Sequence, residues 1–94
     1  MRRFRIKLSE TTDMMNSPDY MERFRCEYLQ LTIRMEGLRA MLEKYKAGTL
    51  PFTPTCSYEL LKKQLDTMNL YKLCLEERAR VENIYLEVMI VNSN

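Results

Sequence analysis

The most regular feature of the sequence is a row of apolar residues that recurs every three or four positions through the middle of the chain. The row consists of Met21, Phe24, Tyr28, Leu31, Met35, Leu38, Leu42 and Tyr45. Spacings that alternate between three and four over four heptads are typical of a helix packed against a partner along its whole length. The pattern predicts a helix over residues 17–47, with Ser17 as N-cap, Pro18 in the first turn and Gly48 as the C-terminal stop.

A second helix is predicted over residues 57–82, after a loop over 48–56 that Pro51 and Pro54 keep out of helical conformation. One apolar row of this helix comprises Tyr58, Leu61, Leu65, Met68, Leu75 and Ala79. A further row holds Leu70, Leu73, Cys74 and Val81. A helix with two apolar rows usually contacts two neighbours. We therefore expect the second helix to pack on the first and also on another copy of the chain.

The two ends of the chain carry patterns typical of strands. Residues 4–8 alternate apolar and basic side chains, which predicts a short strand with one buried face. Residues 9–16 are rich in small polar side chains and are expected to form a connector. After Asn83, a plausible helix stop, residues 84–91 are mostly β-branched or aromatic, so they either form a strand that pairs with 4–8 or extend the second helix.

These elements predict a single, mainly α domain over residues 1–94. Its architecture is a long antiparallel helical hairpin with short N- and C-terminal strands. Because two helices cannot enclose a core between them, we expect homo-oligomerisation to complete the fold, most simply as a four-helix dimer.

Composition excludes several kinds of chemistry. The 94 residues include no His and 2 Gly, which removes His-based catalysis, His metal ligands and a Gly-rich phosphate loop. The three cysteines are widely spaced and form no CxxC motif, so we expect reduced thiols rather than a disulfide framework or a zinc site. We expect a binding protein rather than an enzyme, with no metal and no cofactor.

Charge and hydropathy limit the classes of partner that we expect, and they argue against both nucleic acid and membranes. The formal net charge of +2 is nearly balanced, whereas strong nucleic-acid binders usually carry a one-sided basic excess. No apolar run reaches the roughly 18 residues that span a bilayer, so no membrane contact is expected.

Basic and tyrosine side chains are the most interesting candidates for ligand binding. The predicted ligand-binding residues are Arg3, Arg5, Tyr20, Arg23, Lys63, Tyr71 and Arg78. Arginine binds phosphate, and tyrosine stacks on nucleobases, so the set suits a small nucleotide. A positive pocket would form if the N-terminal strand lay near the start of the first helix, where free backbone N–H groups also attract anions. The alternative is that these side chains are ordinary solvated charge.

Several segments resemble a known protein family. They include Asn16-Ser17-Pro18-Asp19-Tyr20 at the start of the first helix, Ala47-Gly48-Thr49-Leu50 after it, and Met68, Tyr71 and Leu75-Glu76 in the second. Over residues 4–83 the chain is similar to a family of small proteins from tailed phages and prophages, named after a crAss-like gut phage. It departs from the pattern at Ser57, where proline is expected, and in a longer tail.

The resemblance implies a phage accessory protein that works in the host bacterial cytoplasm, and it brings no catalytic residues. Our first hypothesis is an anti-defence binding protein that sequesters a nucleotide immune signal, as a sponge, at an oligomer interface. One alternative is direct inhibition of a host defence protein through the helical surface. Another is a structural or assembly adaptor in phage particles. The expected partners are accordingly a second copy of the chain and either a nucleotide second messenger or a host defence protein.

Overall fold

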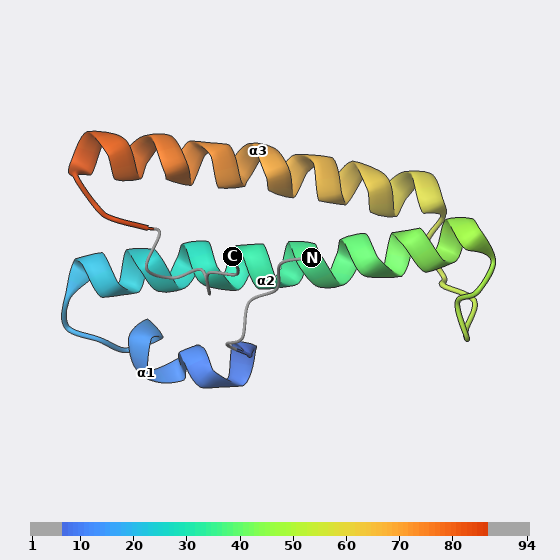
Figure 1. Cartoon of the computed structure of the whole chain (residues 1–94), viewed down its shortest axis with the longest axis horizontal. Helices are drawn as coiled ribbons and strands as arrows, with labels where there is room; N and C mark the ends of the chain where they lie inside the picture. The colour runs from blue at the N-terminus through green and yellow to red at the C-terminus, as the bar shows by residue number, and fades with distance from the viewer. Residues whose placement is uncertain (1–6, 87–94) are drawn as a thin grey trace, which may run out of the picture.

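The computed structural model describes residues 7–86, which form a hairpin of two long helices with a short helical segment packed beside it. The elements are η1 (Leu8–Thr11), α1 (Thr12–Met15), α2 (Tyr20–Ala47) and α3 (Tyr58–Glu82). In Figure 1, α3 runs alongside α2 in the opposite direction, and α1 lies on the other side of α2. The mainly helical fold and the long hairpin predicted from the apolar rows are therefore present.

The start of α2 differs from the prediction. Its N-cap is Asp19 rather than Ser17, because the Asp19 carboxylate accepts a hydrogen bond from the Met21 backbone N–H at 3.0 Å. The Ser17 hydroxyl instead accepts from the Asp19 N–H at 3.0 Å, in the turn before the helix. Pro18 therefore lies outside the helix.

The other three helix ends follow the sequence signals. Gly48 ends α2 in the left-handed conformation, with φ of 76°, where a residue without Cβ is favoured. Ser57 caps α3 by accepting from the Leu60 N–H at 3.1 Å. Asn83 ends α3, also left-handed with φ of 64°, which turns the chain so that the Ile84 N–H bonds back to the Ala79 carbonyl at 2.8 Å.

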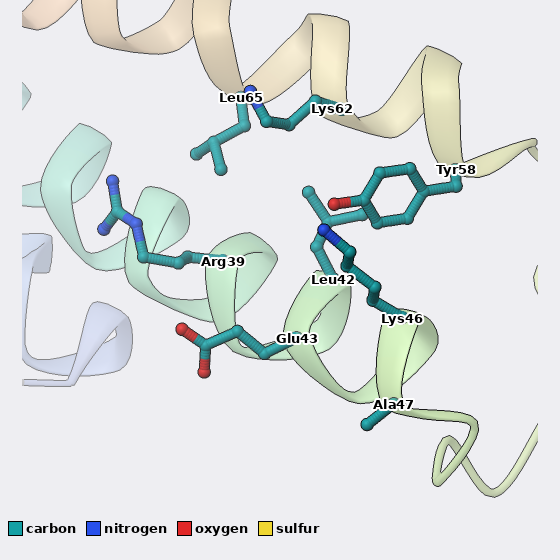
Figure 2. A pocket seen from close by; sticks show the side chains of 8 residues that line it. All are labelled: Arg39, Leu42, Glu43, Lys46, Ala47, Tyr58, Lys62 and Leu65. Carbon is teal, nitrogen blue, oxygen red and sulfur yellow. The ribbon is translucent and has the colours of Figure 1, made fainter.

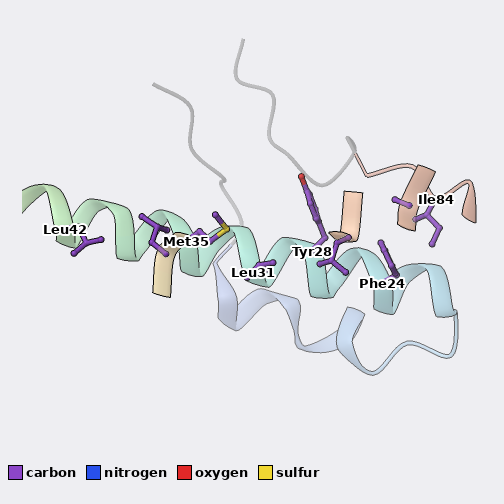
Figure 3. Packing of buried hydrophobic residues seen from close by; sticks show 9 residues of the cluster. Phe24, Tyr28, Leu31, Met35, Leu42 and Ile84 are labelled. Atoms are coloured by element: carbon purple, nitrogen blue, oxygen red, sulfur yellow. The ribbon is translucent and has the colours of Figure 1, made fainter. Parts of the chain in front are cut away.

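The core lies along the seam between α2 and α3 (Figure 3). Its buried residues are Phe24, Tyr28, Leu31, Met35, Leu42, Leu65, Leu75, Ala79 and Ile84. Five of the eight seam positions predicted on the first helix belong to this cluster, and the predicted inward row of the second helix is buried or packed against it. Met21 was expected in the core, but its side chain is 37% exposed because it lies in the first turn, before the seam begins at Phe24.

The opposite face of α2 is covered by the N-terminal segment, where the sequence predicted a connector. Thr11 is fully buried; its carbonyl accepts from the Cys26 thiol at 3.4 Å, and its hydroxyl accepts from the Gln30 amide at 2.7 Å. Glu10 helps to start η1 by accepting from the Lys7 N–H at 2.9 Å. Leu29, fully buried on α2, is among the largest enclosed side chains. Within residues 7–86 it is therefore α2, not α3, that packs against two other helical segments.

The predicted terminal strands are not present within residues 7–86. Leu8 begins η1, so the predicted strand over 4–8 is wrong at its described end, and residues 4–6 lie outside the described chain. Ile84 to Leu86 follow α3 without strand pairing. Residues 87–91, like residues 4–6, lie outside the described chain. Ile84 is instead buried in the hairpin core, and the Arg25 side chain donates to the Tyr85 carbonyl at 2.7 Å. The short tail is thereby tied back onto α2.

Tyr28 provides a polar link inside the seam. Its hydroxyl donates to the Glu76 carboxylate at 2.6 Å, which joins the two helices across the core. Burial raises the pKa of Tyr28 above its ordinary value, and the hydrogen bond to Glu76 raises it further. The phenol is thus held neutral in the folded protein.

The depth of Leu75 in the seam predicts a large effect on stability. Leu75→Ala should lower the free energy of unfolding by about 2–5 kcal/mol, because its side chain is 1% exposed and its removal leaves a cavity. Leu73→Ala, on the same helix but 51% exposed, is the matched control and should cost far less. Urea denaturation at low protein concentration measures both, and equal losses would contradict the packing described here.

The raised pKa of Tyr28 predicts a loss of stability at high pH. Above pH about 10 the unfolded chain releases the phenolic proton while the folded chain retains it, so folding is progressively disfavoured as pH rises. Tyr28→Phe should remove this part of the pH dependence, and Tyr45→Phe, the control on the same helix, should leave it in place. Unfolding followed between pH 8 and 11 tests this, and parallel profiles for the wild type and Tyr28→Phe would refute it.

Candidate functional site

A cleft of about 530 Å³ opens between α2 and α3 near the loop that joins them (Figure 2). Its lining comprises Arg39, Leu42, Glu43, Lys46, Ala47, Tyr58, Lys62 and Leu65. Residues 39–47 at the end of α2 and residues 58–65 at the start of α3 supply these side chains. The volume lies within the range of about 300–1,000 Å³ that is usual for small-molecule sites.

The floor and one wall of the cleft are apolar. Leu42 and Leu65 are buried, with 4% and 8% exposure, and belong to the hairpin core. Tyr58 at the start of α3 packs its ring edge-to-face on Tyr45, with centroids 5.6 Å apart and an interplanar angle of 82°. This contact holds the Tyr58 ring at the cleft without using its whole surface, so the ring remains available for contact with a flat ligand.

Three cationic side chains line the same cleft. Arg39 and Lys46 come from α2 and Lys62 from α3, and they outnumber the one lining carboxylate, Glu43. Figure 2 shows the Glu43 carboxylate directed away from α3. The lining side chains therefore carry a net charge of +2 above an apolar floor, and this excess of cations favours an anion.

Two of these cations have acidic neighbours at the rim. Lys62 binds Asp66 at 2.8 Å, and this hydrogen bond raises the pKa of Lys62, which keeps its ammonium charged. Arg39 lies 3.9 Å from Glu36. Both pairs are exposed to solvent, where such ion pairs contribute little free energy. An incoming phosphate can therefore compete for either cation.

The predicted ligand-binding residues that the structure describes are not gathered at one site. Tyr20 and Arg78 do meet, at the opposite end of the hairpin from the cleft. The Arg78 guanidinium donates to the Tyr20 hydroxyl at 2.9 Å and lies 4.9 Å from the centroid of the Phe24 ring. Glu82 accepts from the Tyr20 hydroxyl at 2.8 Å and from Arg78 at 3.4 Å, and its hydrogen bond raises the pKa of Tyr20. The Glu82 carboxylate already accepts hydrogen bonds from both side chains. We therefore interpret the cluster as a link between α2 and α3 rather than as a ligand site.

The other predicted residues lie apart from that cluster. Arg23 donates to the Ser17 carbonyl at 2.8 Å, in the turn before α2. Lys63 and Tyr71 line a shallow, mostly apolar groove of about 340 Å³ along α3, and the Tyr71 hydroxyl donates to Glu27. Arg3 and Arg5 lie outside the described residues. At the start of α2, where the sequence predicted an anion site, the Asp19 carboxylate occupies the capping position, and the N-terminal residues expected beside it lie outside the described chain.

The charged cleft residues Arg39, Lys46 and Lys62 are not among the predicted binding residues, because in the sequence they look like ordinary helix surface. One signal could have found them. Arg39 and Lys46 are seven residues apart on one side of the first helix, and Tyr58 and Lys62 are four apart on the second. Folding the hairpin about its Pro loop brings these two pairs toward each other.

Neither a metal-binding group nor a membrane-spanning helix is present in the part of the chain that the structure describes. No group of three or more Cys, Asp or Glu residues is placed to hold a metal ion there. No helix within residues 7–86 is long and apolar enough to cross a membrane.

The fold and the cleft define a small helical-hairpin protein with a basic site between its two long helices. A comparison with known families matches residues 18–81 to the family described as Sequestin, and the chain belongs to that family. The match covers α2, the loop after it and all but the last residue of α3, and so includes every residue that lines the cleft. Neither the curated proteins nor the solved structures contain a match. The association with phages that the sequence resemblance implies stays a prediction.

The three cysteines differ sharply in accessibility. Cys26 is buried, and burial raises the pKa of its thiol, whereas Cys56 and Cys74 are exposed. A thiolate is the reactive form, so both factors protect Cys26.

We expect a thiol reagent such as Ellman's reagent, at low protein concentration, to modify two thiols of the folded chain rapidly and the third only on unfolding. Cys26→Ser should abolish the slow phase and leave the fast one unchanged. Three thiols reacting at one rate in the folded protein would contradict the packing of η1 on α2.

Proposed function

We propose that this protein is a sequestering protein that holds a small phosphate-bearing ligand in the cleft between α2 and α3. The observation that carries the proposal is that Arg39, Lys46 and Lys62 all line one apolar-floored cleft. Charge-assisted hydrogen bonds from arginine and lysine bind phosphate, and the Tyr58 ring offers a face for an aromatic base. The family name, Sequestin, is consistent with such a role.

The ligand class that fits best is a nucleotide signal, cyclic or short and linear. A nucleotide combines a flat base with one or more phosphates, which matches an aromatic wall next to several cations. Binding without turnover suits a lining that offers one carboxylate, from Glu43, and no second acid or base to work with it. In our proposal the protein is no enzyme. It acts as a phage anti-defence factor in the host bacterial cytoplasm and lowers the concentration of an immune signal.

A second candidate function is direct inhibition of a host defence protein. The exposed apolar residues on the outer face of α3 support it, since Leu60, Leu70 and Val81 are 53%, 62% and 79% exposed. Such a surface is a common feature of protein interfaces. A pull-down from host lysate separates the two functions, because an inhibitor retains a stoichiometric protein and a sponge retains small molecules.

The cleft proposal predicts that one charge reversal weakens ligand binding. Lys46→Glu should lower affinity for the best ligand of a cyclic and short linear nucleotide panel by at least about tenfold, which corresponds to about 1.4 kcal/mol. Isothermal titration calorimetry measures the change. Lys44→Glu is the matched control, because it makes the same change of charge two residues away and does not line the cleft.

Three outcomes would count against this assignment. Equal weakening by Lys44→Glu would mean that binding depends on net charge rather than on the cleft. Weakening by Arg78→Ala with no effect of Lys46→Glu would place the ligand at the Tyr20–Arg78 cluster. Absence of binding by the wild type to every member of the panel would refute nucleotide sequestration.

A further inference from the structure

A second pocket lies at the opposite end of the hairpin from the cleft, where the chain leaves α3, and we call it the tail pocket. Its volume of about 400 Å³ is within the usual range of about 300–1,000 Å³ for small-molecule sites. The left-handed Asn83 turns the chain back toward α2, as Figure 1 shows, and the Ile84 N–H bonds to the Ala79 carbonyl at 2.8 Å. The Arg25 side chain then donates to the Tyr85 carbonyl at 2.7 Å. Internal hydrogen bonds thus fix the wall that the tail provides.

The floor of the tail pocket is apolar. Ala79 and Ile84 line it and are buried, with 3% and 6% exposure. Leu86 also lines it and packs against the same hairpin core. From α2 the buried Tyr28 reaches the pocket with its ring, while its hydroxyl donates to Glu76. These surfaces suit the apolar part of a small ligand.

Two opposite charges line the tail pocket one helical turn apart. Glu76 and Arg80 are four residues apart with the acid first, an order in which the two side chains usually pair with each other. Among residues 7–86 no ion pair joins them, because Arg80 lies 4.0 Å from Glu77 and Glu76 lies 3.9 Å from Lys72. Both of these contacts are long and partly or fully exposed to solvent, so they hold the charges weakly. An anion and a cation therefore line the same pocket without neutralising each other.

The Glu76 carboxylate is oriented and still has an oxygen to offer. The Tyr28 hydroxyl donates to its Oε2 atom at 2.6 Å, and the Lys72 Nζ atom lies 3.9 Å from the same oxygen. Within the part of the chain that the structure describes, Oε1 accepts no hydrogen bond. An ionised carboxylate accepts through both oxygens, and an arginine carries five N–H donors. Glu76 can therefore receive an ammonium group while Arg80 donates to a carboxylate.

We propose that the tail pocket binds a free amino acid with an apolar side chain. The ammonium group of the ligand donates to Glu76, its carboxylate accepts from Arg80, and its side chain lies on the floor that Ala79 and Ile84 form. Charge-assisted hydrogen bonds at both ends fix the orientation of the ligand. The tail pocket shares no lining residue with the cleft, so this site is independent of the ligand proposed there.

Ligands that lack one charge test the recognition of a zwitterion. In isothermal titration calorimetry with free leucine, methionine and phenylalanine, at least one should bind saturably. Its N-acetyl and its carboxamide derivatives should each bind at least about tenfold more weakly, because each lacks one of the two charges. Absence of binding by all three amino acids would overturn the proposal. Equal binding of the amino acid and both derivatives would overturn it too, since only an apolar contact would remain.

Variants of the two charged residues assign the contacts. Glu76→Gln keeps an oxygen that can accept from Tyr28 but removes the charge, so it should weaken binding of the best amino acid at least about tenfold. It should not weaken binding of the N-acetyl derivative, which has no ammonium group. Arg80→Gln should likewise weaken binding of the amino acid and not that of the carboxamide. Glu77→Gln is the matched control, because it removes the same charge from the next residue, which does not line the pocket.

The remaining outcomes separate this site from general electrostatics and from the cleft. Equal weakening by Glu76→Gln and Glu77→Gln would contradict a dedicated site. Lys46→Glu, which changes the cleft, should leave amino-acid binding unchanged, and a loss of that binding would move the ligand to the cleft and overturn the proposal. Far-UV circular dichroism shows whether each variant is folded. If Glu76→Gln fails to fold, Arg80→Gln decides the proposal, because the Arg80 side chain is 72% exposed.

Discussion

The packing of α2 against α3 along a single apolar seam is the interaction on which the rest of the structure depends. Phe24, Met35 and Leu42 on α2 meet Leu65 and Leu75 on α3, and the Tyr28–Glu76 hydrogen bond fixes the two helices within that seam. Because a seam buries only one face of each helix, the remaining surfaces need other partners. The N-terminal segment covers the second face of α2, whereas the outer face of α3 stays exposed.

The two ends of the seam between α2 and α3 differ in what surrounds them. At the loop end, Leu42 and Leu65 close the core, and Arg39, Lys46 and Lys62, each three or four residues from one of these leucines, line an open cleft. At the other end, Asn83 turns the chain back so that Ile84 completes the core. The two ends thus differ in kind: one is basic and open, and the other is tied by internal hydrogen bonds.

The sequence predicted the features that depend on local signals and helical periodicity. These include the hairpin, the helix stop at Gly48, and the row of α3 that begins at Tyr58 and packs on α2. It did not predict the helical segment at the N-terminus, because the burial of Thr11 depends on contacts with residues 15 and 19 positions away. The cleft depends on how α2 and α3 are aligned along their length. The periodicity of each helix does not define that alignment. The meeting of Tyr20 with Arg78, 58 positions apart, has the same cause, although both had been singled out by residue type.

The measurement that tests the central claim most directly is a nuclear magnetic resonance titration of the full chain with the nucleotide that binds it best. If the cleft is the binding site, shift changes will concentrate on Arg39, Lys46, Tyr58 and Lys62 and leave Tyr20 and Arg78 nearly unmoved. Changes centred on Tyr20 and Arg78, or spread evenly over the basic residues of both helices, would contradict a dedicated site between α2 and α3.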